Sequence, residues 1–223
     1  MTTQYAVCHI ERGSGNDSGM SCHIERKTAE GKEYIPDNAD GSRTHLNREL
    51  IAFPKGVTNR TQAIQHRLDT AGLKRKIGKN QVRAVRILLT GSHEQMISLE
   101  GNGRLDKWCQ ANIKWLHDTF GEENLVSCVL HMDEKTPHLH ATVIPIVTTP
   151  RKRRNREGEQ KYKEKQAAPR LCADEVMARG KLRQYQDTYA KAMSEFGLNR
   201  GVIASGARHQ TQQQYNRQQA LEL

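Results

Sequence analysis

The sequence predicts an α+β fold, and three observations support this. Two apolar runs, Leu125–Leu130 and Leu139–Ile146, are strand-like and are joined by a connection short enough for antiparallel pairing. Residues Val82–Thr90 alternate apolar and polar side chains, as a strand with one buried face does. Apolar residues recur at helical spacing over Leu105–Phe120, a helix that Gly121 ends, and again over Val176–Phe196. At 223 residues, the chain is long enough for one sizeable domain with its own core.

The N-terminal half is expected to contain a strand, a turn and two helices. The strand lies within residues 1–12 and ends at the segment Gly13–Gly19, whose glycines permit positive φ angles. A polar segment then leads into a short helix near Asn47–Ile51. A longer helix is expected over Thr61–Ala71, where apolar residues recur at helical spacing, and Gly72 ends it.

Composition sets the expected domain boundaries. Residues 1–200 are expected to form one domain. Within it, residues 151–168 carry too many charges for a core and are expected to form a mobile surface loop. The long helix that follows, over Val176–Phe196, directs its apolar side inward and stops before Gly197. Residues 201–223 are rich in glutamine and are expected to be a C-terminal extension that begins a further helical region.

The charge balance indicates a polyanionic partner. The chain has 35 Lys and Arg against 25 Asp and Glu, a net charge of +10, which favours nucleic acid or an anionic membrane. No apolar run reaches the roughly 18 to 20 residues of a membrane-spanning helix. The N-terminus lacks the features of a secretory signal, so we expect a cytoplasmic protein. Five cysteines without a C-x-x-C pair favour reduced thiols over disulfides or a zinc knuckle.

A candidate metal site lies in the stretch HMDEKTPHLH. In an extended strand, His138 and His140 point to the same face, about 7 Å apart, and can converge on one ion. His131 ends the preceding strand, where antiparallel pairing would bring it beside them as a third ligand. Three neutral nitrogen ligands leave coordination positions open, as catalytic metal sites do. Imidazole ligands can bind Mn²⁺, Zn²⁺, Co²⁺ or Ni²⁺, while the supply of ions in the cell favours Mn²⁺ or Mg²⁺.

Two carboxylates in the same stretch, Asp133 and Glu134, could bind the ion, orient an imidazole or accept a proton. Of these roles, we expect Glu134 to be the proton acceptor. In a basic protein such an ion suits a phosphodiester, because it polarises a non-bridging oxygen and neutralises charge that develops during in-line displacement. Attack by water would make the protein a nuclease, whereas attack by a side chain would make it a strand-transferring enzyme.

These residues resemble a known family. The pattern H-x-D-E-x-x-P-H-x-H at residues 131–140 resembles the metal motif of the HUH endonucleases. HIER at residues 23–26 and SRTHLNREL at residues 42–50 are similar to the first and second motifs of the Mob/Pre (MobV-type) plasmid mobilization relaxases. TGSHE at residues 90–94 and FGLNRGV with SGARH at residues 196–209 are weaker matches. The ordered set, which spans nearly the whole chain, is more specific than any one motif.

The resemblance implies a central antiparallel β-sheet flanked by helices, as in HUH relaxases and replication initiators, with the HUH strand near its centre. It implies a metal-dependent, site-specific nick in one strand at the origin of transfer of a plasmid or mobile element. Covalent attachment to the 5′-phosphate and later rejoining would follow, for mobilization and plasmid recombination. The implied partners are origin DNA, both single-stranded and hairpin, and the conjugation coupling machinery.

The resemblance also assigns roles to residues. The histidine of the first motif, His23, is the implied nucleophile and would form a phosphoramidate, and Arg26 is the matched contact to DNA or phosphate. The pentapeptide CHIER occurs twice, and His9 of the first copy falls outside the motif, so we expect it to be structural. Tyr34 stays open as a rival nucleophile.

Two departures from the family pattern bear on these assignments. Arg48 follows Asn47 where the family has tyrosine, so a tyrosine nucleophile is impossible there, and Arg48 would contact a phosphate instead of stacking on a base. Ile24 stands where the family prefers asparagine. The expected DNA contacts are Arg26, Arg43, Asn47, Arg48, Lys74, Arg75 and Lys76, with Arg60 in the same basic region.

Two other functions stay open at this level. The first is an HUH rolling-circle replication initiator with a tyrosine nucleophile, for which Tyr185 and Tyr189, four residues apart on the expected long helix, are candidates. The second is a non-catalytic DNA-binding module in which the histidine cluster is only structural.

Overall fold

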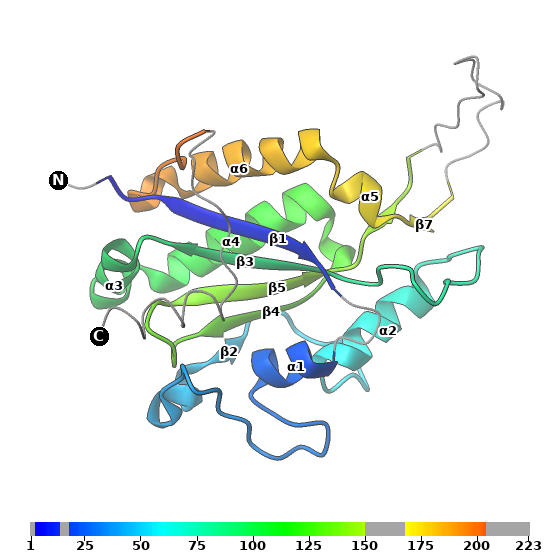
Figure 1. The fold of residues 1–223 in the computed structure, drawn as a ribbon, viewed down its shortest axis with the longest axis horizontal. Coiled ribbons are helices and arrows are strands. Elements are labelled where there is room, and N and C mark those ends of the chain that lie inside the picture. The colour runs from blue at the N-terminus through cyan, green and yellow to red at the C-terminus, as the bar shows by residue number, and fades with distance from the viewer. Residues whose placement is uncertain (1–2, 14–17, 150–167, 204–223) are drawn as a thin grey trace, which may run out of the picture.

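The computed structural model describes residues 3–13, 18–149 and 168–203. Its centre is a five-stranded antiparallel sheet in the order β1-β3-β5-β4-β2, with helices on both faces (Figure 1). The strands are β1 (Ala6–Arg12), β2 (Arg48–Glu49), β3 (Val85–Gly91), β4 (Leu125–His131) and β5 (His138–Val143). The α+β prediction is confirmed. The strand that carries His138 and His140 is the central one, as the resemblance implied.

The helices divide between the two faces of the sheet. The longer helices α4 (Leu105–Phe120) and α6 (Arg179–Met193) cover one face, and α1 (Ser18–Glu25) and α2 (Arg60–Thr70) lie against the other (Figure 1). The other described elements are α3 (His93–Gly101), α5 (Ala173–Val176), the 3₁₀ turns η1 (Gly41–Leu46), η2 (Glu122–Asn124) and η3 (Ser194–Phe196), and the strand pair β6 (Ile146–Val147) and β7 (Arg170–Leu171). None of the described helices is long and apolar enough to span a bilayer.

Alternation along β5 separates the core from the site. Leu139, Ala141 and Val143 are buried in the main core between the sheet and helices α4 and α6. Because successive side chains of a strand point to opposite faces, His138, His140 and Thr142 face α1 and α2. The sequence predicted this division.

The β4–β5 hairpin has the predicted antiparallel pairing. His131 pairs with His138, Leu130 with Leu139 and Val129 with His140. Residues directly opposite each other in an antiparallel pair point to the same face of the sheet. His131 and His138 therefore share a face because of the hairpin register.

Two predicted helices end where glycine takes a positive φ angle. Helix α2 begins at the N-cap Asn59, whose side chain accepts the Gln62 N–H, and it is followed by Gly72 at φ +65°. Helix α4 ends at Gly121, at φ +88°. Both stops were predicted from glycine, which adopts this region without the steric cost of a Cβ atom.

The prediction of a short helix near Asn47–Ile51 is wrong. The helical turn lies earlier, in η1, and Arg48–Glu49 form the edge strand β2. The backbone of this segment pairs with β4: the Leu50 N–H donates to the Cys128 carbonyl, and the Asn47 side chain accepts the Met132 N–H. Pairing with a neighbouring strand outweighs a weak local preference for helix.

The long helix expected over Val176–Phe196 is interrupted. Val176 belongs to the one-turn helix α5, Ala178 is extended at ψ 140°, and α6 begins at Arg179. Helix α3 had no counterpart in the sequence prediction. Most of the charged segment 151–168 and of the extension 201–223 lies outside the described residues, so both expectations stay predictions.

Candidate active site

The predicted metal-binding histidines form one cluster. His131 at the end of β4 and His138 and His140 on β5 have ring centroids 4.8 to 5.1 Å apart. The Nε2 atoms of His138 and His140 are 3.2 Å apart. The hairpin register and the two-residue period of β5 produce this convergence, which was predicted from spacing alone.

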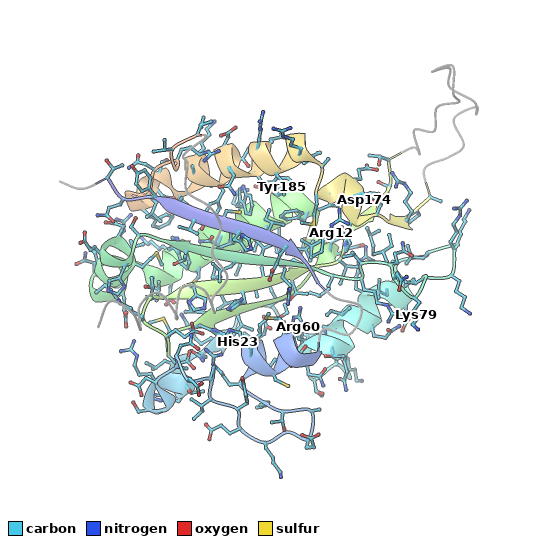
Figure 2. All side chains as sticks on the ribbon, in the orientation of Figure 1. Arg12, His23, Arg60, Lys79, Asp174 and Tyr185 are labelled. Atoms are coloured by element: carbon cyan, nitrogen blue, oxygen red, sulfur yellow. The ribbon has the colours of Figure 1, made fainter. Side chains whose placement is uncertain are left out.

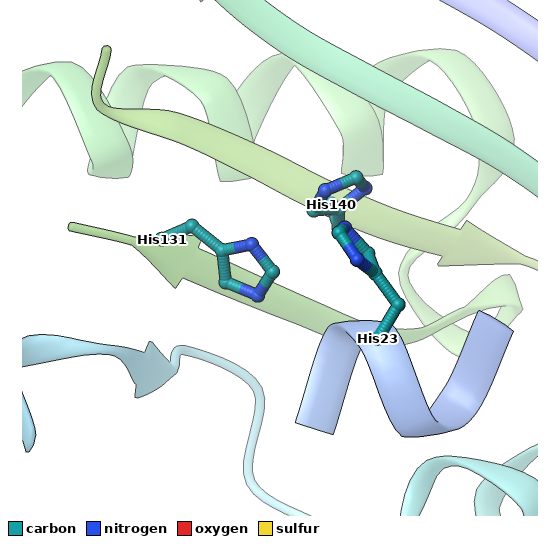
Figure 3. Close-up of side chains that lie close together, drawn as sticks. All are labelled: His23, His131 and His140. Atoms are coloured by element: carbon teal, nitrogen blue, oxygen red, sulfur yellow. The ribbon is translucent and has the colours of Figure 1, made fainter. Parts of the chain in front are cut away.

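A fourth imidazole joins the cluster from a different element. His23 lies in the last turn of α1, and its ring centroid is 5.6 Å from that of His131 and 5.3 Å from that of His140 (Figure 3). Helix α1 places this ring over the face of the sheet that carries the other three. The candidate nucleophile and the candidate metal ligands are therefore in contact.

The two copies of CHIER have different secondary structures. Cys8–Arg12 lies in β1, whereas Cys22–Arg26 forms the end of α1 and the residue that follows it. His9 pairs with Leu88 of β3, which in turn pairs with His140. His9 thus stands two strands away from His140, about 10 Å by the usual strand spacing, and does not join the cluster.

Arg26 closes one side of the site and is buried, with 4% of its side chain exposed. It adopts the left-handed conformation at φ +54°, just beyond the end of α1. Its guanidinium donates to both carboxylate oxygens of Asp133, at 2.8 and 2.9 Å, and to Glu134 Oε1 at 2.7 Å. The motif implied a contact to DNA, but in the structure these donors bond to two carboxylates beneath the cluster.

These contacts hold both carboxyl groups ionised. Burial by itself raises a carboxyl pKa, but the hydrogen bonds and the charge of Arg26 outweigh it and hold the pKa of Asp133 well below its usual range. For Glu134, burial raises the pKa, but the neighbouring His131, the charge of His138 and the Arg26 hydrogen bond outweigh it and lower the pKa to about 2. Both side chains are therefore anionic at neutral pH.

Glu134 occupies the centre of the cluster. Its Oε1 atom is 3.7 Å from His23 Nε2, 3.6 Å from His131 Nδ1 and 3.9 Å from His138 Nε2. Its other oxygen accepts a hydrogen bond from Asn38 Nδ2 at 2.8 Å. The sequence singled out Glu134 as the proton acceptor, and the structure brings it to the candidate nucleophile. Nothing in the spacing of the sequence indicated Asn38.

The donor atoms of the cluster suit a divalent metal ion. The Ile24 carbonyl lies 2.9 Å from His131 Nε2, and the Thr136 carbonyl lies 2.8 Å from His138 Nδ1. Carbonyls accept hydrogen bonds, so these contacts direct the lone pairs of His131 Nδ1 and His138 Nε2 toward the middle of the cluster. Two nitrogens bound to one ion at about 2.0 to 2.1 Å stand about 3.0 to 3.4 Å apart, and the His138–His140 separation of 3.2 Å falls in that range.

Two overlapping sets of side chains have ligand atoms close enough for one ion. One set is His23, His131 and His140, and the other is His131, Glu134 and His138, each with ligand atoms within 4.8 Å of one another. The predicted set His131, His138 and His140 shares two members with each of these sets but is not itself one of them. The geometry therefore leaves His23 and Glu134 near any ion that these three residues would bind.

Burial depresses the pKa values of three imidazoles, those of His23, His138 and His140. It lowers the pKa of His23 from 6.5 to about 4, against the opposing charge of Glu134. Burial likewise lowers the pKa of His138 and holds that of His140 well below its usual value. These rings are therefore neutral at pH 7, which is the form needed both by a nitrogen nucleophile and by a metal ligand.

We predict that the metal-free protein loses stability as the pH falls from about 6.5 toward 4. In the unfolded chain the histidines titrate near pH 6.5 and bind protons that the folded rings exclude, so acid favours unfolding. Asp133 and Glu134, whose pKa values are depressed, keep their stabilising contribution in this window and lose it only at lower pH. Thermal melts between pH 7.5 and pH 4.5 measure the effect, and a constant melting temperature over that range would contradict it.

The expected DNA contacts do not form one surface. Arg43 donates to the Met132 carbonyl and pairs with Glu100, Arg48 pairs with Asp106, and Asn47 bonds the Met132 N–H, all near the end of β4. Lys74, Arg75 and Lys76 are exposed in the segment between α2 and β3. This segment, in which Figure 2 labels Lys79, lies at the far edge of the molecule from His23.

One residue of that basic region is not a surface residue at all. Arg60, the first residue of α2, has none of its surface exposed. The expectation that Arg60 belongs to a basic region that contacts DNA is therefore wrong. A count of charges along the sequence does not distinguish a buried guanidinium from an exposed one.

The tyrosine candidates are separated from the cluster or exposed beside it. Tyr185 donates to the Val176 carbonyl and Tyr189 to Asn112 Oδ1, and both are buried in the core on the opposite face of the sheet. Tyr34 is 40% exposed and follows α1, with its backbone N–H donating to the Arg26 carbonyl. Of the candidate nucleophiles, His23 is the one whose ring contacts the cluster.

Comparison with known proteins agrees with the motifs. The family model described as plasmid recombination enzyme (Mob_Pre) matches residues 2–217. A 65 kDa protein of Zymomonas mobilis subsp. mobilis is 30% identical over 216 residues, which is 95% of this chain and 32% of the relative. Plasmid recombination enzyme type 3 of Staphylococcus aureus is 27% identical over 214 residues, or 94% of this chain and 46% of the relative. The chain thus spans less than half the length of these curated relatives.

Solved structures show the same fold. The MobM relaxase domain (MOBV; Mob_Pre) bound to plasmid pMV158 oriT DNA, in a Mn-bound crystal structure at pH 5.5, has a TM-score of 0.75 at 22% identity, covering 96% of this chain and 99% of that chain. A second Mn-bound structure of that domain at pH 6.8 has a TM-score of 0.74 at 24% identity, covering 96% and 98%. With the family model matching nearly its whole length, the chain belongs to the plasmid recombination enzyme (Mob_Pre) family.

Proposed function

We propose that the chain is a DNA relaxase domain, a metal-dependent enzyme that nicks and rejoins one strand of origin-of-transfer DNA on a plasmid or mobile element. The observation that carries the proposal is the contact between His23 and the cluster of His131, His138 and His140. Family membership and the DNA-bound state of the MobM relaxase domain support it. The implied partners are single-stranded and hairpin origin DNA and the conjugation coupling machinery.

In this proposal, His131 Nδ1, His138 Nε2 and His140 Nε2 hold one divalent ion. Manganese or magnesium is the expected ion, because the related MobM structures are Mn-bound and because both are supplied in cells. When bound, the ion polarises a non-bridging oxygen of the scissile phosphate and neutralises negative charge that develops during displacement.

His23 acts as the nucleophile. Its ring is neutral at pH 7 because burial lowers its pKa to about 4, so a nitrogen lone pair is available to attack phosphorus. A phosphorus–nitrogen bond forms to the 5′-phosphate while the bond to the 3′-oxygen breaks, and the released 3′ end takes a proton to become a hydroxyl. Glu134, 3.7 Å from His23 Nε2, accepts the ring proton. Attack by a 3′-hydroxyl on the phosphoramidate reverses these steps and rejoins the strand.

Arg26 is proposed to act by positioning. Its guanidinium holds Glu134 through one hydrogen bond and lies 3.3 Å from His23 Nδ1, so one side chain sets the place of the nucleophile and of the proton acceptor. Arg43, Asn47, Arg48 and the exposed segment Lys74–Lys76 are left as DNA contacts. The arginines and lysines among them would neutralise phosphates, so binding should weaken as the salt concentration rises.

The proposal is tested by a nicking assay on a set of supercoiled plasmids. Between them, these plasmids carry the whole genetic element that encodes the chain. We expect open-circle product with Mn²⁺ and none with a chelator. Replacing His138 or His140 with alanine should weaken Mn²⁺ binding by at least about 100-fold and abolish nicking. His117→Ala, on α4 across the sheet, is the matched control and should nick normally.

The alternatives give different results in the same assay. DNA binding without nicking, in any metal, would leave a non-catalytic DNA-binding module. Nicking with the DNA attached to a tyrosine would favour a rolling-circle initiator, although the burial of Tyr185 and Tyr189 on the opposite face argues against that mechanism.

A further inference from the structure

Arg60 connects the two elements that carry the candidate nucleophile and a candidate metal ligand. Its Nε atom donates to Thr142 Oγ1 on β5 at 2.7 Å, and its Nη1 atom donates to Ser21 Oγ on α1 at 2.9 Å. Its backbone N–H donates to Glu25 Oε1, also on α1, at 2.7 Å. Figure 2 labels Arg60 beside His23, on the same side of the sheet.

The partners of Arg60 flank the reacting groups in sequence. Ser21 and Glu25 stand two residues before and two residues after His23 on α1. Thr142 stands two residues after His140 on β5 and points to the same face of the sheet. The fully buried side chain of Arg60 therefore bridges α1, which carries His23, and β5, which carries His140.

Helix α1 depends on such contacts for its position. It has 8 residues, and an isolated helix of that length is not stable in water. Its far end is held by Arg26, which bonds Asp133 and Glu134. Arg60 holds the preceding turn through Ser21, whose hydroxyl also lies 3.2 Å from Thr61 Oγ1. Without the Arg60 side chain, α1 would lose its link to Thr142 on β5 and would be held less firmly against the sheet.

We propose that Arg60 is a positioning residue for strand transfer, which holds α1 against β5 so that the His23 ring stays over the His131–His138–His140 cluster. The inference rests on the proposed function. A buried guanidinium is costly to desolvate and is kept where its hydrogen bonds specify one arrangement. Because reacting groups displaced by about 1 Å lose about 100-fold in rate, the role predicts a loss in the covalent step and not in binding.

The test compares Arg60→Met, which keeps length but removes the donors, with Arg60→Lys, which retains one cationic donor. The measured quantities are the single-turnover rate of covalent adduct formation on saturating nick-site oligonucleotide, the Kd for that oligonucleotide and the Kd for Mn²⁺. For Arg60→Met we expect a rate about 100-fold lower, with both Kd values within about threefold of the wild type. Arg60→Lys should recover part of the rate.

A matched control separates positioning from stability. Asn112 is also fully buried and hydrogen-bonded, to the Trp108 carbonyl and Tyr189, but on the opposite face of the sheet. Asn112→Leu should lower the melting temperature and leave the adduct rate unchanged at temperatures where the variant is folded. Because a role in stability alone would make Arg60→Met behave like Asn112→Leu, that result would overturn the inference.

If Arg60→Met does not fold, Ser21→Ala and Thr142→Val replace it, since each removes one of the two bonds by which the guanidinium joins α1 to β5. Each should slow adduct formation, and the double variant should be no slower than the more impaired single variant, because either change already releases the link. Rates that equal the wild type, or that multiply independently, would contradict the inference. Wild-type protein that forms no adduct at all would refute the proposed function itself.

Discussion

His23→Ala is expected to abolish the covalent protein–DNA adduct and to lower the rate of nicking by at least about 1,000-fold. The loss of a nucleophile in other covalent enzymes has effects of this order or larger. Among the described residues, the other three histidines of the cluster are not available to replace it, because His131 and His138 each use one ring nitrogen toward a carbonyl and, with His140, direct the other toward the metal position. Mass spectrometry of the peptide–oligonucleotide adduct is the measurement.

The sequence supplies a matched control for this variant. His9 stands in an identical pentapeptide but lies on β1, two strands from His140, so His9→Ala should form the adduct at the wild-type rate. Tyr34→Phe should also form it. An adduct that maps to a tyrosine, or that persists in His23→Ala, would show that the nucleophile has been misassigned.

The same variant separates the two candidate ligand sets. If His131, His138 and His140 hold the ion, His23→Ala should bind Mn²⁺ with nearly wild-type affinity. If His23 is itself a ligand, as the set His23, His131 and His140 allows, the affinity should fall along with the nicking rate. Calorimetric titration with Mn²⁺, in the absence of DNA, distinguishes the two outcomes.

Arg26→Met is expected to lower the free energy of unfolding by about 3 to 5 kcal/mol. The Arg26 side chain is 4% exposed and that of Asp133 is fully buried, so the substitution leaves a buried carboxylate without its cation. Such a charge is expensive to keep away from water. Urea denaturation at pH 7, monitored by tryptophan fluorescence, measures the change.

Two comparisons test the physical reason. Arg12→Met breaks an exposed ion pair with Asp174 and should cost less than about 1 kcal/mol. Adding Asp133→Leu to Arg26→Met should recover part of the lost stability, because it removes the unpaired charge. A cost for Arg26→Met as small as that for Arg12→Met would mean that the two carboxylates remain solvated in solution.

Much of the fold could be predicted from local patterns. The alternation in β3, the apolar runs of β4 and β5, and the glycine stops of α2 and α4 are each properties of a short segment, and the structure confirms them. The errors came where a segment depends on a distant partner. The backbone at Asn47–Leu50 pairs with β4, some 80 residues away, and no periodicity within the segment reports that pairing.

The candidate site shows the same division. The grouping of His131, His138 and His140 follows from strand period and hairpin register, which are local, so it could be predicted from the spacing. The place of His23 could not, since the motif indicated the residue but not the helix that carries it. The carboxylate partners of the Arg26 side chain lie 107 and 108 residues away, and the hydroxyl partners of the Arg60 side chain lie 39 and 82 residues away.

By itself, the sequence determined the α+β class, the histidine hairpin, the basic character of the chain and the ordered motifs of its family. The motif indicated His23, but only the tertiary structure decided that its ring joins the cluster and that the ring of His9 does not, because CHIER is a strand where it pairs with β3 and a helix where it packs beside α2. It also decided that Arg26 and Arg60 are buried links and not surface cations. The physical reason is that side-chain period is a local property, whereas burial and the partner of a charge depend on the whole fold.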